Sequence, residues 1–423
     1  MSLLALFPFF PALSCALVTV KVDGNVAEVG YYYATLWVGT PPTKRTLLID
    51  TGSGLTGFPC EDCQACGQHS GPHFRRTLSA TSREISCSEV NCADCRNDTC
   101  HYTLKYSEGS EVSGSLTEDF VTLEKHGTAL PLVFGCHDSE TNLFRTQKAD
   151  GVLGLSLTQA SSKGYFQTLI DAYHAQGLTA STDFALCLGL QGGVLSLGGS
   201  NPGLDSTVPQ SIRLLGLSHY EVSLAGLSLG LAPLIPAQIP YRTLLDSGTT
   251  FTYFQSEMYE EIWTQLRASC KGICGEEVVV PGERRPCYRH SAGPLKTFLR
   301  LFPEIYIWLD DQQVLWKPIN YLYAWPDRPH DYCAAFFSSG NGENVLGSSF
   351  MRGLHLAFSR ANHTLAISQS KCDIRTLSPQ ILRPEKETTG PSATGVFLLA
   401  AAVGIFVLLI AGSDKALETL IRL

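Results

Sequence analysis

Leu47-Leu-Ile-Asp50-Thr-Gly-Ser53 is an apolar run that leads into an acidic residue, a hydroxyl residue and a glycine. The same pattern returns in the second half of the chain as Thr243-Leu-Leu-Asp246-Ser-Gly-Thr249. Each copy is followed, about 100 residues later, by two apolar residues and a glycine, at 152–154 and at 345–347. A repeat in the same order and at nearly the same interval predicts two related lobes.

The residues around each aspartate have separate expected roles. A glycine allows the backbone to turn tightly or to approach a neighbour closely. One hydroxyl is expected to bond across the junction between the lobes, and another to bond to the outer oxygen of its own aspartate. The glycines are Gly52 and Gly248, and the hydroxyl residues expected to bond across the junction are Thr51 and Ser247. Those expected to bond to their own aspartates are Ser53 and Thr249.

Asp50 and Asp246 are the predicted catalytic pair. Two carboxyl groups in contact cannot both ionise comfortably, so they share one proton. The ionised partner then removes a proton from a bound water, and the protonated partner donates to the scissile carbonyl oxygen. Since water is the nucleophile, no metal and no cofactor are expected. A single Asp-Thr-Gly could equally be a structural turn, but the matched second copy argues against that alternative.

The pattern of the intervening sequence is rich in strands. Short aromatic or β-branched runs bounded by Gly and Pro predict strands at 31–39 and 46–49, and the alternation at 214–231 is similar. Helical spacing is rare, with candidates at 257–266 and at 165–174. Many short strands with few helices predict an all-β architecture.

Composition excludes some classes of protein. The 423 residues are 44% hydrophobic and only 17% charged, which argues against extended disorder. The formal net charge of -8 gives no basic surplus to neutralise phosphates, so nucleic acid is not an expected partner.

Both ends of the chain predict membrane targeting. The apolar segment 1–16 is typical of a secretory signal cleaved after Ala16, although a buried strand or short anchor is the alternative. Residues 376–392 predict a stalk, and 393–412 predict one spanning helix with a cytoplasmic tail at 413–423. A removable lipid-anchor signal is the alternative for the C-terminus, but the charged residues that follow do not suit it.

The cysteines predict a disulfide framework. The chain has 15, and cleavage after Ala16 would leave an even number. Cys-x-x-Cys spacings also resemble zinc or iron–sulfur sites, but a secretory signal favours disulfides, with no metal. Their connectivity cannot be read from the sequence. The expected disulfide cysteines are Cys60, Cys63, Cys66, Cys87, Cys92, Cys95, Cys100, Cys136, Cys187, Cys270, Cys274, Cys287, Cys333 and Cys372. Asn97 and Asn362 stand in glycosylation sequons.

With both acidic motifs in view, the chain resembles the pepsin-like aspartic proteases from about Tyr31 to Cys372. The resemblance implies a bilobal β fold with the active cleft between an N-terminal lobe, 17–182, and a C-terminal lobe, 183–375. It also implies a flap hairpin, for which 102–114 is the candidate, and Tyr106 matches the family's flap tyrosine.

One departure narrows the resemblance. Digestive members carry a tryptophan where this chain has Gly57, and a cysteine-rich insertion, 60–100, follows. The insertion, the Tyr-Ser-Glu-Gly-Ser flap and the C-terminal span are similar to plasmepsin V-type membrane-anchored proteases of apicomplexan parasites. That family implies a lumenal enzyme of the endoplasmic reticulum or Golgi that cleaves exported proteins after the leucine of Arg-x-Leu. Glu108 matches the glutamate that binds the arginine, and Gln147 the glutamine that assists it.

The sequence therefore predicts a monomeric aspartic endopeptidase with polypeptide substrates and a single-pass, type I membrane anchor. A general processing or shedding protease of the secretory pathway or cell surface is the first alternative. The second is an inactive adhesion protein on a protease scaffold.

Overall fold

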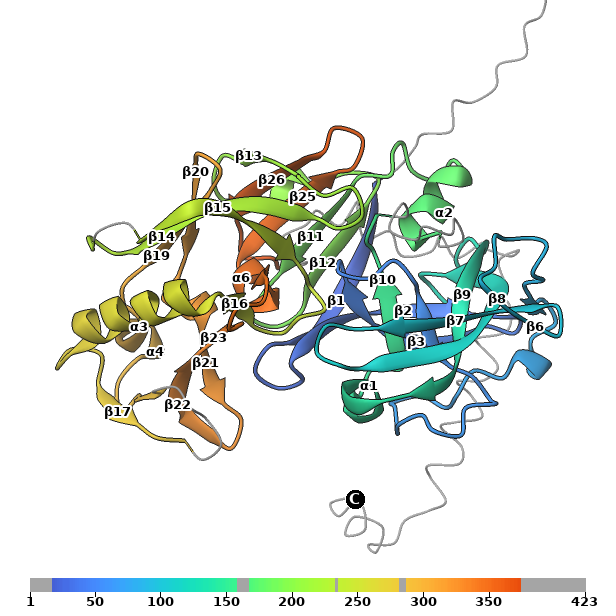
Figure 1. Cartoon of the computed structure of the whole chain (residues 1–423), viewed down its shortest axis with the longest axis horizontal. Coiled ribbons are helices and arrows are strands. Elements are labelled where there is room, and N and C mark those ends of the chain that lie inside the picture. Colours follow the sequence, from blue (N-terminus) through green and yellow to red (C-terminus); the bar gives the residue numbers. More distant parts are fainter. Residues whose placement is uncertain (1–16, 158–166, 233–234, 281–286, 374–423) are drawn as a thin grey trace, which may run out of the picture. The chain divides into compact units, whose positions relative to one another are not determined.

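The computed structural model describes residues 17–157, 167–232, 235–280 and 287–373 (Figure 1). The predicted signal, stalk, spanning helix and tail lie outside these residues. No helix in the described ranges is both long and apolar enough to cross a bilayer. The sequence predicted an all-β architecture, and the structure is mostly β: strands form most of the regular structure, with a few helices among them.

The largest sheet among the described residues has 15 strands and draws on both halves of the sequence. Its path runs β13-β26-β25-β11-β12-β1-β2-β3-β10-β4-β9-β8-β7-β6, with β5 paired to β8. The bounds are β1 (Val18–Asn25), β2 (Tyr31–Val38), β3 (Thr43–Asp50), β4 (Gly57–Pro59), β5 (Arg83–Glu84), β6 (Asp94–Arg96), β7 (Thr99–Lys105), β8 (Glu111–Thr122), β9 (Leu130–Glu140), β10 (Gly151–Gly154), β11 (Phe184–Leu188), β12 (Gly193–Leu197), β13 (Gln210–Arg213), β25 (Leu354–Ser359) and β26 (Thr364–Gln369).

Two smaller sheets belong to the second half. One has the order β20-β19-β14-β15-β24-β16-β23, and the other β17-β18-β22-β21. Their strands are β14 (Glu221–Leu229), β15 (Ile235–Leu245), β16 (Thr252–Phe254), β17 (Glu276–Val278), β18 (Cys287–Arg289), β19 (Ile305–Leu309), β20 (Gln312–Trp316), β21 (Leu322–Trp325), β22 (Arg328–Ala334), β23 (Phe336–Ser338) and β24 (Asn344–Leu346).

The described helices are short apart from α3. They are α1 (Asn142–Thr146), α2 (Leu169–Ala175), α3 (Ser256–Cys270), α4 (Leu295–Leu299), α5 (Pro318–Tyr321) and α6 (Ser348–Met351), with 3-10 turns at Arg76–Leu78 and Pro202–Leu204. The helix expected at 257–266 is confirmed, and its periodic apolar residues are buried. The helix expected from Tyr165 begins only at Leu169, because Thr168 and Asp171 form a capping box there. Of the expected 214–231 strand, only 221–229 is regular.

The internal repeat has a direct structural meaning. In the first half, β3 pairs in parallel with β10, and Asp50 lies opposite Gly154. In the second half, β15 pairs in parallel with β24, and Leu245 lies opposite Leu346. Each downstream Val-Leu-Gly therefore lies in, or at the end of, a strand that pairs with the strand leading to an aspartate. This pairing explains why the two motifs recur together.

All fourteen expected cysteines are paired in the described residues, which leaves none of them as a free thiolate for a metal. The pairs are Cys60–Cys136, Cys63–Cys66, Cys87–Cys95, Cys92–Cys100, Cys187–Cys372, Cys270–Cys274 and Cys287–Cys333.

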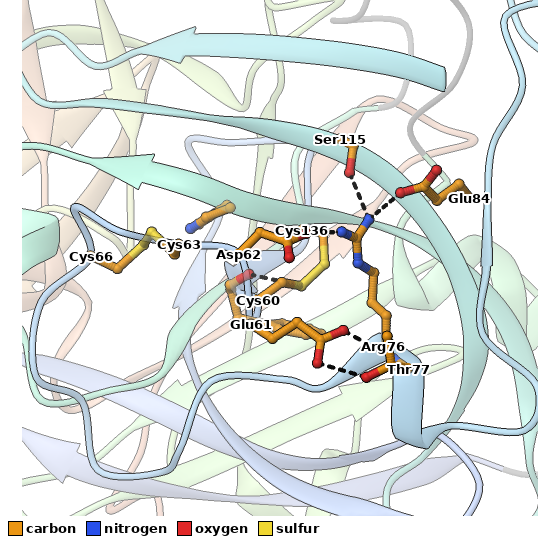
Figure 2. The surroundings of a disulfide bond; sticks show 12 residues. Cys60, Glu61, Asp62, Cys63, Cys66, Arg76, Thr77, Glu84, Ser115 and Cys136 are labelled. Carbon is orange, nitrogen blue, oxygen red and sulfur yellow. Dashed lines mark hydrogen bonds and ion pairs between the residues drawn. A yellow bond between two sulfur atoms is a disulfide. The ribbon is translucent and has the colours of Figure 1, made fainter. Parts of the chain in front are cut away.

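The cysteine-rich insertion is held to the sheet by more than disulfides. Figure 2 shows the Cys60–Cys136 bridge that fixes its start to β9. Beside it, the Arg76 guanidinium donates to Glu84 at 2.5 Å and to Ser115 at 3.1 Å. Arg76 also pairs with Asp62. These contacts hold the insertion against β8 and β9, and its short strands β5 and β6 belong to the same sheet.

Candidate active site

The first aspartate lies at the carboxyl end of β3, where the apolar strand leaves the sheet. Asp50 is only 5% exposed. Its Oδ1 accepts the Gly52 N–H at 2.7 Å, and its Oδ2 accepts the Ser53 hydroxyl at 2.6 Å. These two donors fix the carboxyl group in one orientation.

The second aspartate directly follows β15 and has the same two kinds of donor. Asp246 Oδ1 accepts the Gly248 N–H at 2.9 Å, and its Oδ2 accepts the Thr249 hydroxyl at 2.5 Å. The expected bond from each outer hydroxyl to its own aspartate is therefore present in both turns.

The remaining hydroxyls connect the turns to each other. The Thr51 hydroxyl donates to the Leu245 carbonyl at 2.8 Å, and the Ser247 hydroxyl donates to the Ile49 carbonyl at 2.7 Å. Each hydroxyl oxygen also accepts the other residue's backbone N–H, at 2.9 and 3.1 Å. Both side chains are fully buried, so this reciprocal set fixes the distance between the turns.

The turns bring the two carboxyl groups together. A Cβ added at Gly52 would lie 2.8 Å from Asp246 Cγ, and one added at Gly248 would lie 2.6 Å from Asp50 Oδ1. Each carboxyl group therefore occupies the space that a side chain at the opposite glycine would need. Burial, and then the negative charge of Asp246, raise the pKa of Asp50 well above its usual range.

The hairpin of β7 and β8 carries the predicted flap tyrosine. Tyr106 follows β7, and its ring packs against Phe144 of α1 with centroids 4.8 Å apart. Its phenol interacts with the Ser53 side chain, and burial followed by the Asp50 charge raises its pKa. The neutral phenol therefore stands beside the first aspartate turn.

The two residues expected to bind the arginine of the substrate lie in different environments. Glu108 is exposed in the hairpin turn and makes no ion pair or hydrogen bond within the described ranges. Gln147 caps the end of α1, and its buried Nε2 has no hydrogen-bond partner in the described structure. α1, which Gln147 caps, contacts β8, the second strand of the hairpin that carries Glu108.

A sequence model described as "Eukaryotic aspartyl protease" matches residues 31–370, which is most of the chain. The chain belongs to the eukaryotic aspartyl protease family. The expected enzyme class, an aspartic endopeptidase and thus a hydrolase, is confirmed by this membership.

Individual relatives of this aspartyl protease are only modestly similar. Aspartic protease 5 of Toxoplasma gondii is 30% identical over 83% of the chain, which spans only 37% of that relative's length. Plasmepsin V of Plasmodium falciparum is 23% identical over 92% of the chain and 78% of its own length. Nepenthesin-1 of Nepenthes gracilis is 25% identical over 81% of the chain and 78% of its own length.

Sequence reasoning did not find the contact by which Asn142 holds the predicted flap of this aspartyl protease. Asn142 begins α1 at a φ of 46°, a left-handed conformation that asparagine tolerates better than most residues. Its Nδ2 donates to the Gly109 carbonyl in the flap turn at 2.8 Å. An asparagine at the start of a helix was the available signal, but its partner lies in another element.

The predicted glycosylation sites lie on the surface. Asn97 and Asn362 are both exposed, so a glycan could reach either side chain without unfolding the chain. Their glycosylation stays a prediction.

Proposed function

We propose that this chain cleaves peptide bonds with a water activated by Asp50 and Asp246, and that it processes secretory or exported proteins after the leucine of Arg-x-Leu. The observation that carries the catalytic part is the contact between two carboxyl groups in matched turns. The raised pKa of Asp50 is the electrostatic consequence of that contact.

The chemistry follows from one proton shared between two carboxyl groups. The outer oxygens of the carboxyl groups accept hydrogen bonds from the hydroxyl groups of Ser53 and Thr249, so each carboxyl group keeps a fixed orientation. The ionised member removes a proton from water, and the protonated member donates to the carbonyl oxygen as the tetrahedral intermediate forms. Proton return to the leaving amine then completes hydrolysis without an acyl-enzyme.

Recognition of arginine is assigned to Glu108. Its carboxylate is exposed at the flap turn, and no ion pair within the described residues competes for it. A carboxylate can accept two parallel N–H bonds from a guanidinium, which an ammonium group cannot copy. The unpartnered Nε2 of Gln147 supports an assisting role near the same substrate residues.

The proposed setting is the lumen of the endoplasmic reticulum or Golgi, with the chain anchored by residues 393–412. Seven disulfides in the described structure support an oxidising compartment. The apolar segments at the two ends, which lie outside the described residues, support the signal and the anchor.

Peptide cleavage tests the specificity. Two peptides that differ only in Arg-x-Leu against Lys-x-Leu should differ in kcat/KM by at least about tenfold, and Glu108→Gln should remove most of that difference. Glu111→Gln is the matched control, because Glu111 lies in the same hairpin and pairs with Lys105. Equal cleavage of both peptides by the wild type would instead favour a general processing protease, and no cleavage of any peptide would favour the adhesion alternative.

A further inference from the structure

A buried cluster of two histidines and one glutamate lies next to the start of α1, the helix that contacts the flap. Glu140 ends β9, and its side chain is fully buried. Its Oε2 lies 3.0 Å from His69 Nε2, and its Oε1 lies 2.9 Å from His137 Nδ1. Both imidazoles are almost fully buried as well. The proposed hydrolysis uses none of these groups.

The hydrogen bonds of His69 determine its charge. Its Nε2 faces the Glu140 carboxylate, and its Nδ1 lies 2.9 Å from the Ala149 carbonyl oxygen. Both partners are acceptors, so both ring nitrogens must carry a proton and the ring is an imidazolium. Burial opposes this charge, but the bonds to Glu140 and Ala149 outweigh it and raise the pKa of His69. Burial also opposes the Glu140 charge, yet the bonds from His137 and His69 lower its pKa to about 2.

The segment that follows Glu140 holds the flap. Asn142 donates to the Gly109 carbonyl of the flap turn at 2.8 Å. Two residues later, the Phe144 ring packs against Tyr106 at 4.8 Å. The position of α1 therefore sets the position of the flap turn and its tyrosine.

The other side of the same segment rests on the cysteine-rich insertion. A Cβ at Gly67 would lie 2.0 Å from the Arg145 carbonyl oxygen, so the two backbones are in close contact. The Ser70 N–H donates to the Lys148 carbonyl at 2.8 Å. His69 lies between these two contacts in the sequence. The loop at 60–71 is thus a support behind α1.

We propose that His69 and Glu140 are positioning residues: their buried ion pair fixes α1 against the cysteine-rich insertion, and loss of the His69 proton at rising pH loosens the flap. The consequence for substrate binding rests on the proposed proteolytic function. The consequence for the flap itself does not.

The direction of the pH effect follows from the two charges. Folding raises the pKa of His69. The contribution of the ion pair to stability is therefore complete below the ordinary histidine pKa of 6.5, and it is lost as the pH rises through the raised pKa. Glu140 sets the acid limit, since it stays ionised until the pH approaches about 2.

Other titratable groups face the pair. His137 bonds to Glu140, Tyr102 interacts with Glu140, and the charge of Asp150 acts on His69. The Tyr31 phenol accepts the N–H of Ala149, the residue whose carbonyl oxygen bonds to His69. Burial raises the pKa of both tyrosines, so the phenols stay neutral throughout the histidine range. In the described part of the chain, the His137 ring bonds to Glu140 Oε1 through Nδ1 alone. The His69 ring is held by an acceptor at each nitrogen, so His69 is the group that must be charged.

Hydrogen exchange of the flap amides, in particular Tyr106 and Gly109, tests the proposal without using activity. In the wild type, protection corrected for the intrinsic rate should be constant up to about pH 6.5 and should fall as the pH rises further. Glu140→Gln should lower flap protection about tenfold at the acid end and abolish the pH step. His355→Gln is the matched control, because His355 Nδ1 lies 2.8 Å from Asp205 in a similar buried pair outside the flap region. This control should leave flap exchange unchanged.

Kinetics then test the link to substrate. Glu140→Gln should raise KM about tenfold and leave kcat within about twofold, because the aspartate turns are untouched. Flap protection of the wild type that does not change with pH would overturn the proposal, even if Glu140→Gln failed to fold. Unchanged flap exchange in a folded Glu140→Gln protein would overturn it too. The predicted exchange with no peptide cleavage by the wild type would support the positioning and refute the proposed function.

Discussion

The turn at Asp50 and the turn at Asp246 have the same bonds but different neighbours. Each carboxyl group accepts one backbone N–H and one hydroxyl, and Thr51 and Ser247 connect the turns reciprocally. Within the described residues, Tyr106 of the flap bonds to Ser53 of the first turn, whereas the second turn acts on it through the negative charge of Asp246. The first half also carries the insertion that supports this flap.

This difference separates two tasks. The bonds common to both turns hold two carboxyl groups in contact, and that contact supplies the chemistry of hydrolysis. The additions to the first half hold the flap and the residue proposed to read arginine. Changes in the common part should therefore act on kcat, and changes in the additions should act on substrate binding.

The largest expected effect is on the common part. Asp50→Asn and Asp246→Asn should each lower kcat by about a thousandfold or more, because one proton can no longer be shared between two carboxyl groups. The double variant should be little worse than either single one, since the pair acts as a unit. Steady-state kinetics on one peptide checks this. Activity that survives either substitution would remove the catalytic assignment.

Asp50→Asn should lower activity but raise stability. Because burial and Asp246 raise the pKa of Asp50, its contribution to stability is complete below its ordinary value of 3.8 and is lost as the pH rises through the raised pKa. Asparagine does not ionise, so Asp50→Asn should gain in Tm over the wild type as the pH increases. A Tm difference that is the same at every pH would contradict the raised pKa.

Much of this common part could be predicted from the sequence. The apolar run, the aspartate and the glycine recur, and so do the Val-Leu-Gly segments that pair in parallel beside them. Such signals are local and repeated, which is why the aspartates and their hydroxyl partners could be named in advance. Tyr106 was found through its place in a hairpin that resembles a known flap.

The additions could be predicted only in outline. The cysteines indicated disulfides, but pairs such as Cys187–Cys372 join residues 185 apart, and no local pattern records the partner. His69 and Glu140 are 71 residues apart and belong to no periodic pattern. Their ion pair depends on how the insertion packs against β9, and a single sequence does not contain that information.

A smaller effect is expected from the outer hydroxyls. Ser53→Ala should lower kcat/KM about tenfold, because it removes a bond to Asp50 and an interaction with Tyr106. Thr249→Ala removes only the corresponding bond to Asp246, so its effect should be smaller. The comparison requires both variants on the same peptide. Equal losses would mean that the flap contact adds nothing to the first turn.

The smallest expected effect concerns Gly57, where the two halves differ at one matched position. Gly57 pairs with Val152, and Tyr253 pairs with the corresponding Val345 in the second half. A Cβ at Gly57 would lie 2.5 Å from His137 Nε2, so this ring occupies the space that a side chain would need. Gly57→Ala should lower the free energy of unfolding by about 1–3 kcal/mol, as overpacking does in a filled core.

Denaturant unfolding measures this loss, and two further variants locate its cause. Gly54→Ala is the control, because a Cβ there meets nothing within 4 Å, and its free energy of unfolding should change by at most about 0.5 kcal/mol. In a His137→Ala background, Gly57→Ala should cost less, since the ring that it strikes is gone. If the cost were the same in both backgrounds, His137 would not be the reason that the first half keeps a glycine where the second half has a tyrosine.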